Sequence, residues 1–269
     1  MPPVLVYSVD FSNGNLVPSL HANGWGAMKR GNSGAASRPE SFADSKGLNL
    51  GLYRDAATPA GQDATNTVYV VLGANVLPVA SRLLLRTEFD QPWARPAYAP
   101  LTPTNFQTQG SNTTTAGSPW AIALNVKFGT ENDAPTDRRI TSTCQFNNTT
   151  GNGVRLNTPG HAQGDMSTPL DSPLDYANYW PANATNLFSL ESAFCGLKSS
   201  PPPAGNGYCV GNGAMTIGNR RDQRVQSSVA FSGAGAQTWI GALGVALVTQ
   251  QGVGQILIRL RTFSVSIWK

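Results

Sequence analysis

The sequence predicts an all-β protein: an antiparallel β-sandwich with long loops and at most one or two short helices. Three observations support this. Apolar and polar residues alternate over several short segments, long connections rich in Gly, Pro and Asn separate these segments, and charged residues make up only 13% of the chain, against about 25% in an average domain. We expect the 269 residues to form one domain over residues 1–269, since single sandwiches of roughly 200 to 250 residues are common.

The closing segment from Gln255 to Lys269 is predicted to be one long strand whose buried face changes partway along. One face is shared by Ile256, Ile258 and Leu260, and the other by Phe263, Val265 and Ile267. Because strand side chains alternate with a period of two, this change requires either a bulge near Arg261 or burial first by one sheet and then by its partner. Both solutions indicate a sandwich.

Period-two alternation predicts further strands along the chain. They are Val4 to Phe11, Thr67 to Leu72, Leu83 to Phe89, Ala121 to Phe128 and Ile140 to Phe146. The fourth is expected to be half-exposed, with Asn125 and Lys127 on its polar face. Trp239 to Val248 is apolar on both faces and rich in small Gly and Ala residues, which predicts an interior strand.

One short helix is predicted from Asn186 to Phe194, with Thr185 or Asn186 as its cap. The residues at helical spacing are Leu187, Leu190, Glu191 and Phe194.

The cysteines suggest one disulfide bond. Cys195 and Cys209 flank a loop rich in Pro and Gly, and we expect a disulfide between them in an oxidising compartment, where closing a loop of about 15 residues is worth roughly 3 kcal/mol. Cys144 alternates with apolar neighbours and is predicted to be a small buried residue.

The strand pattern resembles that of concanavalin-like jelly rolls, a class that includes lectins, glucanases and alginate lyases. The best candidate for chemistry is the run from Arg86 to Asp90, whose alternation places Arg86 and Glu88 on one face. Arg-Thr-Glu-Phe is similar to the Arg-Thr-Glu-Leu strand of alginate-lyase-type jelly rolls, which implies that Arg86 neutralises a substrate carboxylate. The Gln-x-His and Tyr-x-Lys elements of that family do not occur here, so the general base and acid have no candidate.

The same segment resembles two other fragments. Glu88-x-Asp90 is similar to part of the Glu-x-Asp-x-x-Glu nucleophile strand of laminarinase-like glycosidases, but Trp93 stands where the second Glu is expected, and retention needs two carboxylates about 5 to 5.5 Å apart. It also resembles the start of a legume-lectin-like metal site, without the Asn, Asp and His expected downstream. The alternative is a structural Arg86–Glu88 pair. His21 and His161 stand alone, so no metal or cofactor is predicted, and Ca²⁺ has no motif to support it.

Aromatic and polar residues in the long loops are the favoured ligand-binding candidates. They are Trp93, Arg95, Tyr98, Asp175, Tyr176, Asn178, Tyr179 and Trp180. An aromatic ring stacks on the apolar face of a pyranose, while Asp, Asn and Arg groups bond its hydroxyls. The alternative is that these rings pack against the sandwich and hold the long loops in place.

The favoured function is therefore non-catalytic, lectin-like carbohydrate binding, with a glycan or another polyhydroxylated or anionic ligand as partner. The alternatives are a glycoside hydrolase or polysaccharide lyase using Arg86, Glu88 and Asp90, and a structural virion-surface or capsid-decoration protein that assembles into oligomers or particles. The net charge of +4 is scattered, so no nucleic-acid partner is predicted. No apolar run approaches the roughly 20 residues of a membrane span and no signal peptide is visible, and we expect an extracellular or virion-surface location.

Overall fold

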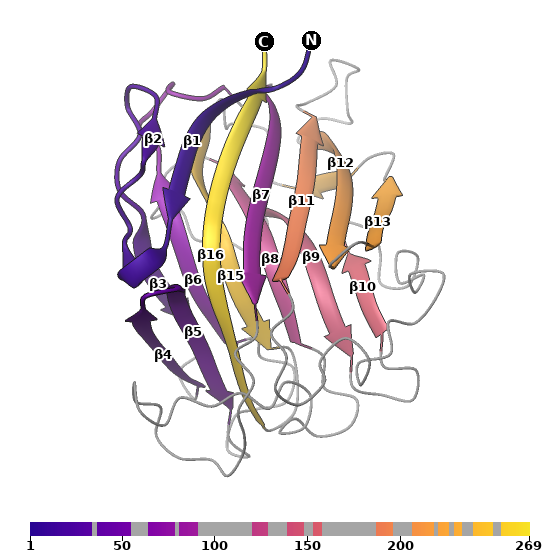
Figure 1. The fold of residues 1–269 in the computed structure, drawn as a ribbon. Helices are drawn as coiled ribbons and strands as arrows, with labels where there is room; N and C mark the ends of the chain where they lie inside the picture. Colours follow the sequence, from indigo (N-terminus) through magenta and orange to yellow (C-terminus); the bar gives the residue numbers. More distant parts are fainter. Residues whose placement is uncertain are drawn as a thin grey trace.

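Two antiparallel sheets lie face to face in the computed structural model (Figure 1). The structure describes residues 1–33, 37–54, 64–78, 81–90, 120–128, 139–147, 153–157, 187–195, 206–217, 220–225, 229–232, 239–249 and 254–269. The arrangement confirms the predicted antiparallel β-sandwich. No helix among these residues is long and apolar enough to cross a membrane.

The front sheet in Figure 1 has ten strands and contains both ends of the chain. Its strands are β1 (Val4–Asp10), β2 (Leu20–His21), β4 (Ser37–Asp44), β5 (Gly47–Arg54), β7 (Arg82–Asp90), β11 (Leu187–Cys195), β12 (Asn206–Ile217), β13 (Arg220–Val225), β14 (Val229–Ser232) and β16 (Gly254–Trp268). The main path runs β13-β12-β11-β7-β16-β1-β2, with β5 also beside β16. A single turn of 3₁₀ helix, η1 (Ser12–Gly14), follows β1.

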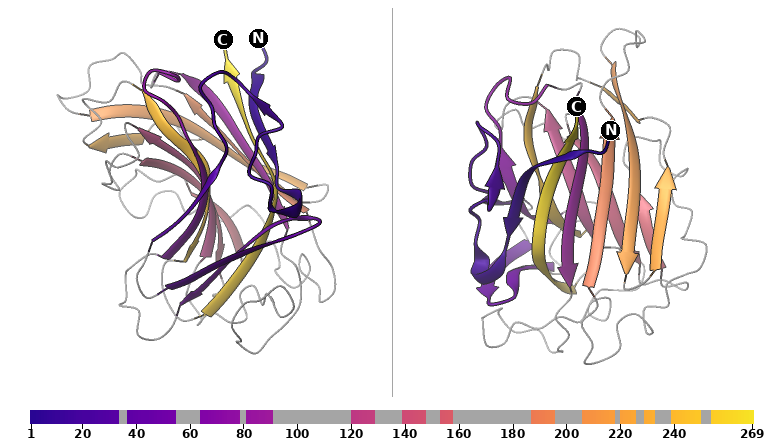
Figure 2. Two further views of the ribbon diagram at one scale, coloured as in Figure 1. Left: turned by 90° about the vertical axis from the view of Figure 1, so that its left-hand side faces the viewer. Right: turned by 45° about the horizontal axis from the view of Figure 1, so that its top comes forward.

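The rear sheet has six strands in the order β10-β9-β8-β15-β6-β3. They are β3 (Lys29–Ser33), β6 (Ala64–Val71), β8 (Trp120–Phe128), β9 (Arg139–Asn147), β10 (Gly153–Asn157) and β15 (Ile240–Thr249). The predicted interior strand is β15, which lies between β8 and β6 and is buried on both faces. In Figure 2 these strands bend so that the side facing away from the ten-stranded sheet is the inside of the curve.

The core fills the space between the sheets, because alternate residues of each strand point inward. The largest fully buried side chains are Tyr7, Phe11, Phe89, Phe263, Leu48, Leu50, Leu52 and Leu83. Burying a side chain of this size contributes about 1.5–3 kcal/mol. One polar contact also joins the layers: Asn66 on β6 donates from Nδ2 to the carbonyl of Gly51 on β5 at 3.0 Å.

A bulge in β16, one of the two predicted solutions, explains its change of buried face. The register against β7 shifts between Leu260 and Thr262, which leaves Arg261 as the extra residue. Leu260 before the bulge and Phe263 after it are both fully buried. The strand pairs with β5 before the shift and with β1 after it, so the bulge lets one strand serve two neighbours in turn.

The helix predicted from Asn186 to Phe194 is wrong, because this segment forms strand β11. Leu190 and Phe194 are four residues apart, a spacing that fits a helix and equally fits one face of a strand. Ser192 between them is 1% exposed, and the strand places it on the same buried face as Leu190 and Phe194. Pairing with β7 on one side and β12 on the other decides the outcome, since tertiary contacts override weak local propensity.

Candidate functional site

A hollow of about 300 Å³ lies on the outward face of the six-stranded sheet. We call it the β15 hollow. The described residues that line it are Gly31, Asn32, Thr65, Thr67, Tyr69, Asn125, Lys127, Ala242, Leu243 and Gly244. They come from four neighbouring strands, β3, β6, β15 and β8. A volume of this size is at the lower end of the range for small-molecule sites.

Small residues on β15 form the floor of the hollow. Leu243 and Val245 point into the core and are fully buried, whereas Ala242, Gly244 and Ala246 alternate with them on the outward side. Gly244 pairs with Tyr69 on one side and Asn125 on the other. A Cβ atom at Gly244 would lie 2.4 Å from the carbonyl oxygen of Val68, so only glycine fits this floor.

Tyr69 forms one wall. Its ring lies beside the edge strand β3. A Cβ atom built on Gly31 of β3 would be only 3.0 Å from the ring atom Cε1. Thr65 and Thr67 stand on the same side of β6 and bring hydroxyl groups to the lining. This wall therefore combines an aromatic ring with hydrogen-bonding groups.

Asn125 forms the opposite wall with Lys127. The Asn125 side chain belongs to a residue that is 8% exposed, and its Oδ1 atom is buried with no hydrogen-bond partner among the described residues. Buried polar atoms without a partner are rare in native proteins. The predicted half-exposed face of β8 is therefore wrong at Asn125, which is buried between the neighbouring strands β15 and β9.

Sequence reasoning did not select the β15 hollow as a site. The residues that line it are divided among three predicted strands. Threonine and tyrosine alternate on the strand around Tyr69, Asn125 and Lys127 share a face of the second strand, and Gly and Ala residues lie on the third, around Gly244. Only the strand order β8-β15-β6 brings these three patterns side by side.

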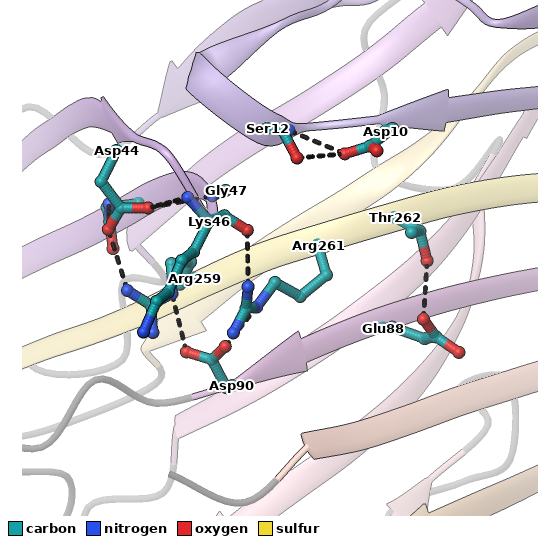
Figure 3. A network of polar contacts seen from close by, with 11 residues as sticks. Asp10, Ser12, Asp44, Lys46, Gly47, Glu88, Asp90, Arg259, Arg261 and Thr262 are labelled. Atoms are coloured by element: carbon teal, nitrogen blue, oxygen red, sulfur yellow. Dashed lines mark hydrogen bonds and ion pairs between the residues drawn. The ribbon is translucent and has the colours of Figure 1, made fainter.

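Arg86 and Glu88 lie on the outward face of the other sheet, paired with each other. The Arg86 Nη2 atom is 2.7 Å from Glu88 Oε1, and Arg86 Nε donates to Ser189 Oγ at 3.0 Å. Thr262 Oγ1 donates to Glu88 Oε2 at 3.3 Å (Figure 3). The expected shared face is confirmed, while the catalytic role of these residues stays a prediction.

Asp90 is 1% exposed and bound by two arginines. Arg259 Nε is 2.9 Å from Asp90 Oδ1, and Arg261 Nε, on the bulge residue, binds Oδ2 (Figure 3). Arg259 Nη1 also lies 2.9 Å from Asp44 Oδ2. The bulge thus directs both guanidinium groups at one carboxylate, and the network ties β16 to β7 and to the β4–β5 hairpin.

The pKa values of this network shift as its contacts require. Burial alone would lower the pKa of Arg259, but its bonds and charge contacts with Asp44 and Asp90 outweigh this and raise it. Burial would likewise raise the pKa of Asp44. Hydrogen bonds from Asn49, Arg259 and the Lys46 backbone outweigh that effect and lower it. Both groups are therefore held in their charged forms.

The predicted loop ligands lie outside the described residues and stay predictions. They are Trp93, Arg95, Tyr98, Asp175, Tyr176, Asn178, Tyr179 and Trp180. The register of β11 and β12 pairs Cys195 with Val210, which follows Cys209 in the chain. The side chains of the two cysteines are outside the described part, so their disulfide also stays a prediction.

Within the described ranges, no three His, Cys, Asp or Glu side chains cluster closely enough to hold a metal ion. His21 is exposed, and its Nδ1 lies 3.2 Å from the carbonyl of the adjacent Ala22.

No protein-family model matches the chain, and no curated protein does. Solved structures similar to it include alginate lyase vAL-1 from Chlorella virus, 9% identical with a TM-score of 0.44, covering 91% of this chain and 93% of that chain. A lectin from Bauhinia forficata in complex with GalNAc is 8% identical with a TM-score of 0.42, covering 97% and 98%. The carbohydrate recognition domain of Emp46p in its potassium-bound form is 10% identical with a TM-score of 0.38, covering 95% of each chain. At these identities and TM-scores, the matches carry no information about the ligand. The resemblance to concanavalin-like jelly rolls is one of fold, and it rests on the two face-to-face antiparallel sheets.

Proposed function

We propose that this protein is a non-catalytic carbohydrate-binding β-sandwich that holds its ligand in the β15 hollow. The observation that carries the proposal is the row Tyr69–Gly244–Asn125 across three strands, in which an aromatic side chain and a buried amide lie on either side of a floor residue without a side chain. A sugar ring has an apolar face for the tyrosine and hydroxyl groups for the amide.

The remaining lining residues suit the same class of ligand. Thr65 and Thr67 offer hydroxyl groups, Asn32 offers a second amide, and Lys127 offers an ammonium group at the β8 side. Concave sites for small ligands combine apolar surface with a few polar groups that fix orientation. This composition supports recognition of a polyhydroxylated molecule.

The lining favours binding without catalysis. None of the described residues that line the hollow is Asp or Glu, whereas glycoside hydrolysis generally requires two carboxylates on either side of the scissile bond. Glu88 and Asp90 lie on the other sheet. The predicted loop residues around Trp93 and Trp180 are proposed as further contacts, and the extracellular or virion-surface location stays a prediction.

A glycan array of neutral, uronic-acid-containing and sulfated oligosaccharides tests the proposal. The wild-type protein is expected to bind a subset, and Tyr69→Ala is expected to weaken that binding about tenfold or more through loss of ring stacking. Tyr69→Phe should retain it. Trp268→Ala, at a half-buried aromatic position on the other sheet, is the matched control and should leave binding unchanged.

Two results would count against the proposal. Absence of binding to any glycan, or binding that is indifferent to Tyr69→Ala, would refute the hollow as the sugar site. Release of reducing ends or of unsaturated product absorbing in the ultraviolet from a bound glycan would refute its non-catalytic character.

A further inference from the structure

The strands of the two sheets differ in the sign of their charged residues. The six strands of the sheet that carries the β15 hollow contain no Asp or Glu. Their basic residues are Lys29, Arg30, Lys127, Arg139 and Arg155. The strands of the ten-stranded sheet contain the acidic residues Asp10, Glu40, Asp44, Glu88, Asp90, Glu191 and Asp222. The hollow therefore lies on a sheet whose strands contain charged residues of positive sign only.

Two lysines stand on opposite sides of the hollow. Lys127 on β8 is half-buried and belongs to its lining. Lys29 on the edge strand β3 is exposed and pairs with Tyr69 in the register, and directly paired residues on neighbouring strands share a face of the sheet. Because β6 and β15 separate β3 from β8, three strand spacings of about 4.8 Å put these two strands about 14 Å apart. A ligand that fills the hollow therefore has a lysine on each side.

Both lysines are suited to bind an anion, although each also has an interaction within the chain. An ammonium group has three donor hydrogens, so it can bind a carboxylate or sulfate oxygen in addition to a protein contact. The described residues that line the hollow include no acidic side chain, so none of them repels a bound anion. A half-buried charge such as that of Lys127 is also screened by salt less than a fully exposed one.

We propose that the β15 hollow binds an acidic glycan, with a carboxylate or sulfate group of the ligand on Lys127 and a pyranose ring packed against Tyr69. The inference rests on the proposed function and narrows its ligand to oligosaccharides that contain uronic acid or sulfate groups. Lys29 binds a further acidic group on the β3 side, so that an extended ligand runs across the strands from β8 to β3.

The lining favours a glycan over a nucleic acid, which is also anionic. Proteins that bind single strands without sequence preference stack successive bases on several aromatic side chains. Tyr69 is the single aromatic residue among the described residues that line the hollow. The other described lining residues are small, aliphatic, hydroxyl, amide or ammonium groups, which suits the hydroxyl and acidic groups of a sugar.

Binding to an oligogalacturonate, a sulfated oligosaccharide and a neutral oligosaccharide of equal length tests the inference. The wild-type protein is expected to bind at least one of the two acidic ligands about tenfold or more tightly than the neutral one, and Lys127→Gln should remove about tenfold of that affinity. Lys29→Gln should cost less, about two- to fivefold, because Lys29 is exposed. Lys46→Gln, in the turn between β4 and β5 of the other sheet, removes the same charge and should leave binding unchanged.

Two further measurements keep the test independent of any effect of Lys127→Gln on folding. Lys127→Arg retains the positive charge and should bind the acidic ligands more tightly than Lys127→Gln does. Raising the salt concentration to about 0.5 M should weaken binding of the acidic ligands to the wild-type protein and leave binding of the neutral ligand unchanged. Binding of an acidic ligand that is insensitive to salt would overturn the inference.

The outcomes separate this inference from the function on which it rests. If the wild-type protein binds no glycan, the proposed function fails. If it binds the neutral ligand as tightly as the acidic ones and Tyr69→Ala weakens this binding, the sugar site stands and the inference is overturned. Equal losses in Lys127→Gln and Lys46→Gln would show attraction to net charge alone and would also overturn it. Single-stranded DNA that binds as tightly as the acidic glycans, and is lost in Tyr69→Ala, would make the hollow a nucleic-acid site instead.

Discussion

The two outward faces of the sandwich both present polar residues but differ in how these residues are partnered. On the ten-stranded sheet, Glu88 and Asp90 are bonded to neighbouring arginines and to Thr262. On the six-stranded sheet, Asn125 keeps an unpaired acceptor over a floor of small residues. The paired charges hold neighbouring strands together, whereas the buried Asn125 oxygen makes no such bond within the described residues.

Removing Asp90 should give the largest effect. Asp90→Ala leaves Arg259 and Arg261 without their shared carboxylate, and losing one partner of a buried ion pair typically costs about 3–5 kcal/mol. We expect the urea concentration at the unfolding midpoint to fall accordingly, while the dependence of the unfolding free energy on urea concentration stays unchanged. Asp10→Ala, at an exposed aspartate near the end of β1, is the control and should cost much less. An Asp90→Ala protein of wild-type stability would refute the structural role of this network.

Three glycine-to-alanine changes probe the other face. Gly244→Ala should cost about 1–3 kcal/mol as overpacking, because its Cβ would meet the Val68 carbonyl oxygen at 2.4 Å. Gly31→Ala should change stability less, since the atom it meets at 3.0 Å belongs to the Tyr69 ring, but it should alter glycan binding as that ring turns. Gly26→Ala meets nothing within 4 Å and should stay within about 0.5 kcal/mol of wild type.

Chemical unfolding of the three variants measures their free energies of unfolding. The test is whether the loss of stability is largest for Gly244→Ala and smallest for Gly26→Ala. Equal stability of Gly244→Ala and Gly26→Ala would mean that the floor of the hollow has room for a side chain, which would remove the structural reason for glycine at this position.

Much of the fold could be predicted from the sequence because burial imposes a period of two on each strand. The bulge at Arg261 could be predicted for the same reason as one of two alternatives, since the buried face of β16 changes between Leu260 and Phe263. Strand β11 could not be predicted from the sequence, because the spacing of Leu190 and Phe194 fits a helix as well as a strand. Its pairing with β7 and β12 makes it a strand.

The candidate site was less predictable because it depends on which strands are neighbours. Tyr69, Asn125 and Gly244 are separated by 56 and 119 positions in the chain (125 − 69 and 244 − 125), and no local pattern links them. By contrast, Arg86 and Glu88 attract attention because they are two residues apart. Proximity in sequence thus selected the face where charges are already paired.

The contribution of Asp44 to stability should depend on pH in the acidic range. The folded-state pKa of Asp44 is lowered from its ordinary value of 3.8, so the stability it contributes is fully present above about pH 5 and is lost as the pH falls through its folded pKa, below 3.8. Asp44→Asn should therefore differ most from wild type in unfolding temperature near neutral pH, with the difference shrinking below pH 4. A difference that is constant down to pH 3 would contradict the assignment.

Glu88→Gln should have the smallest effect on stability. It breaks the ion pair with Arg86, whose side chain is 48% exposed against 27% for Glu88, and exposed pairs of this kind contribute about 0.2–1 kcal/mol. The variant should also leave glycan binding unchanged, because Glu88 lies on the face opposite the β15 hollow. Urea unfolding and the glycan array measure both properties on one preparation. If Glu88→Gln instead abolished turnover of a glycan while stability moved by less than about 1 kcal/mol, the paired face would be the functional one and the contrast between the two faces would be reversed.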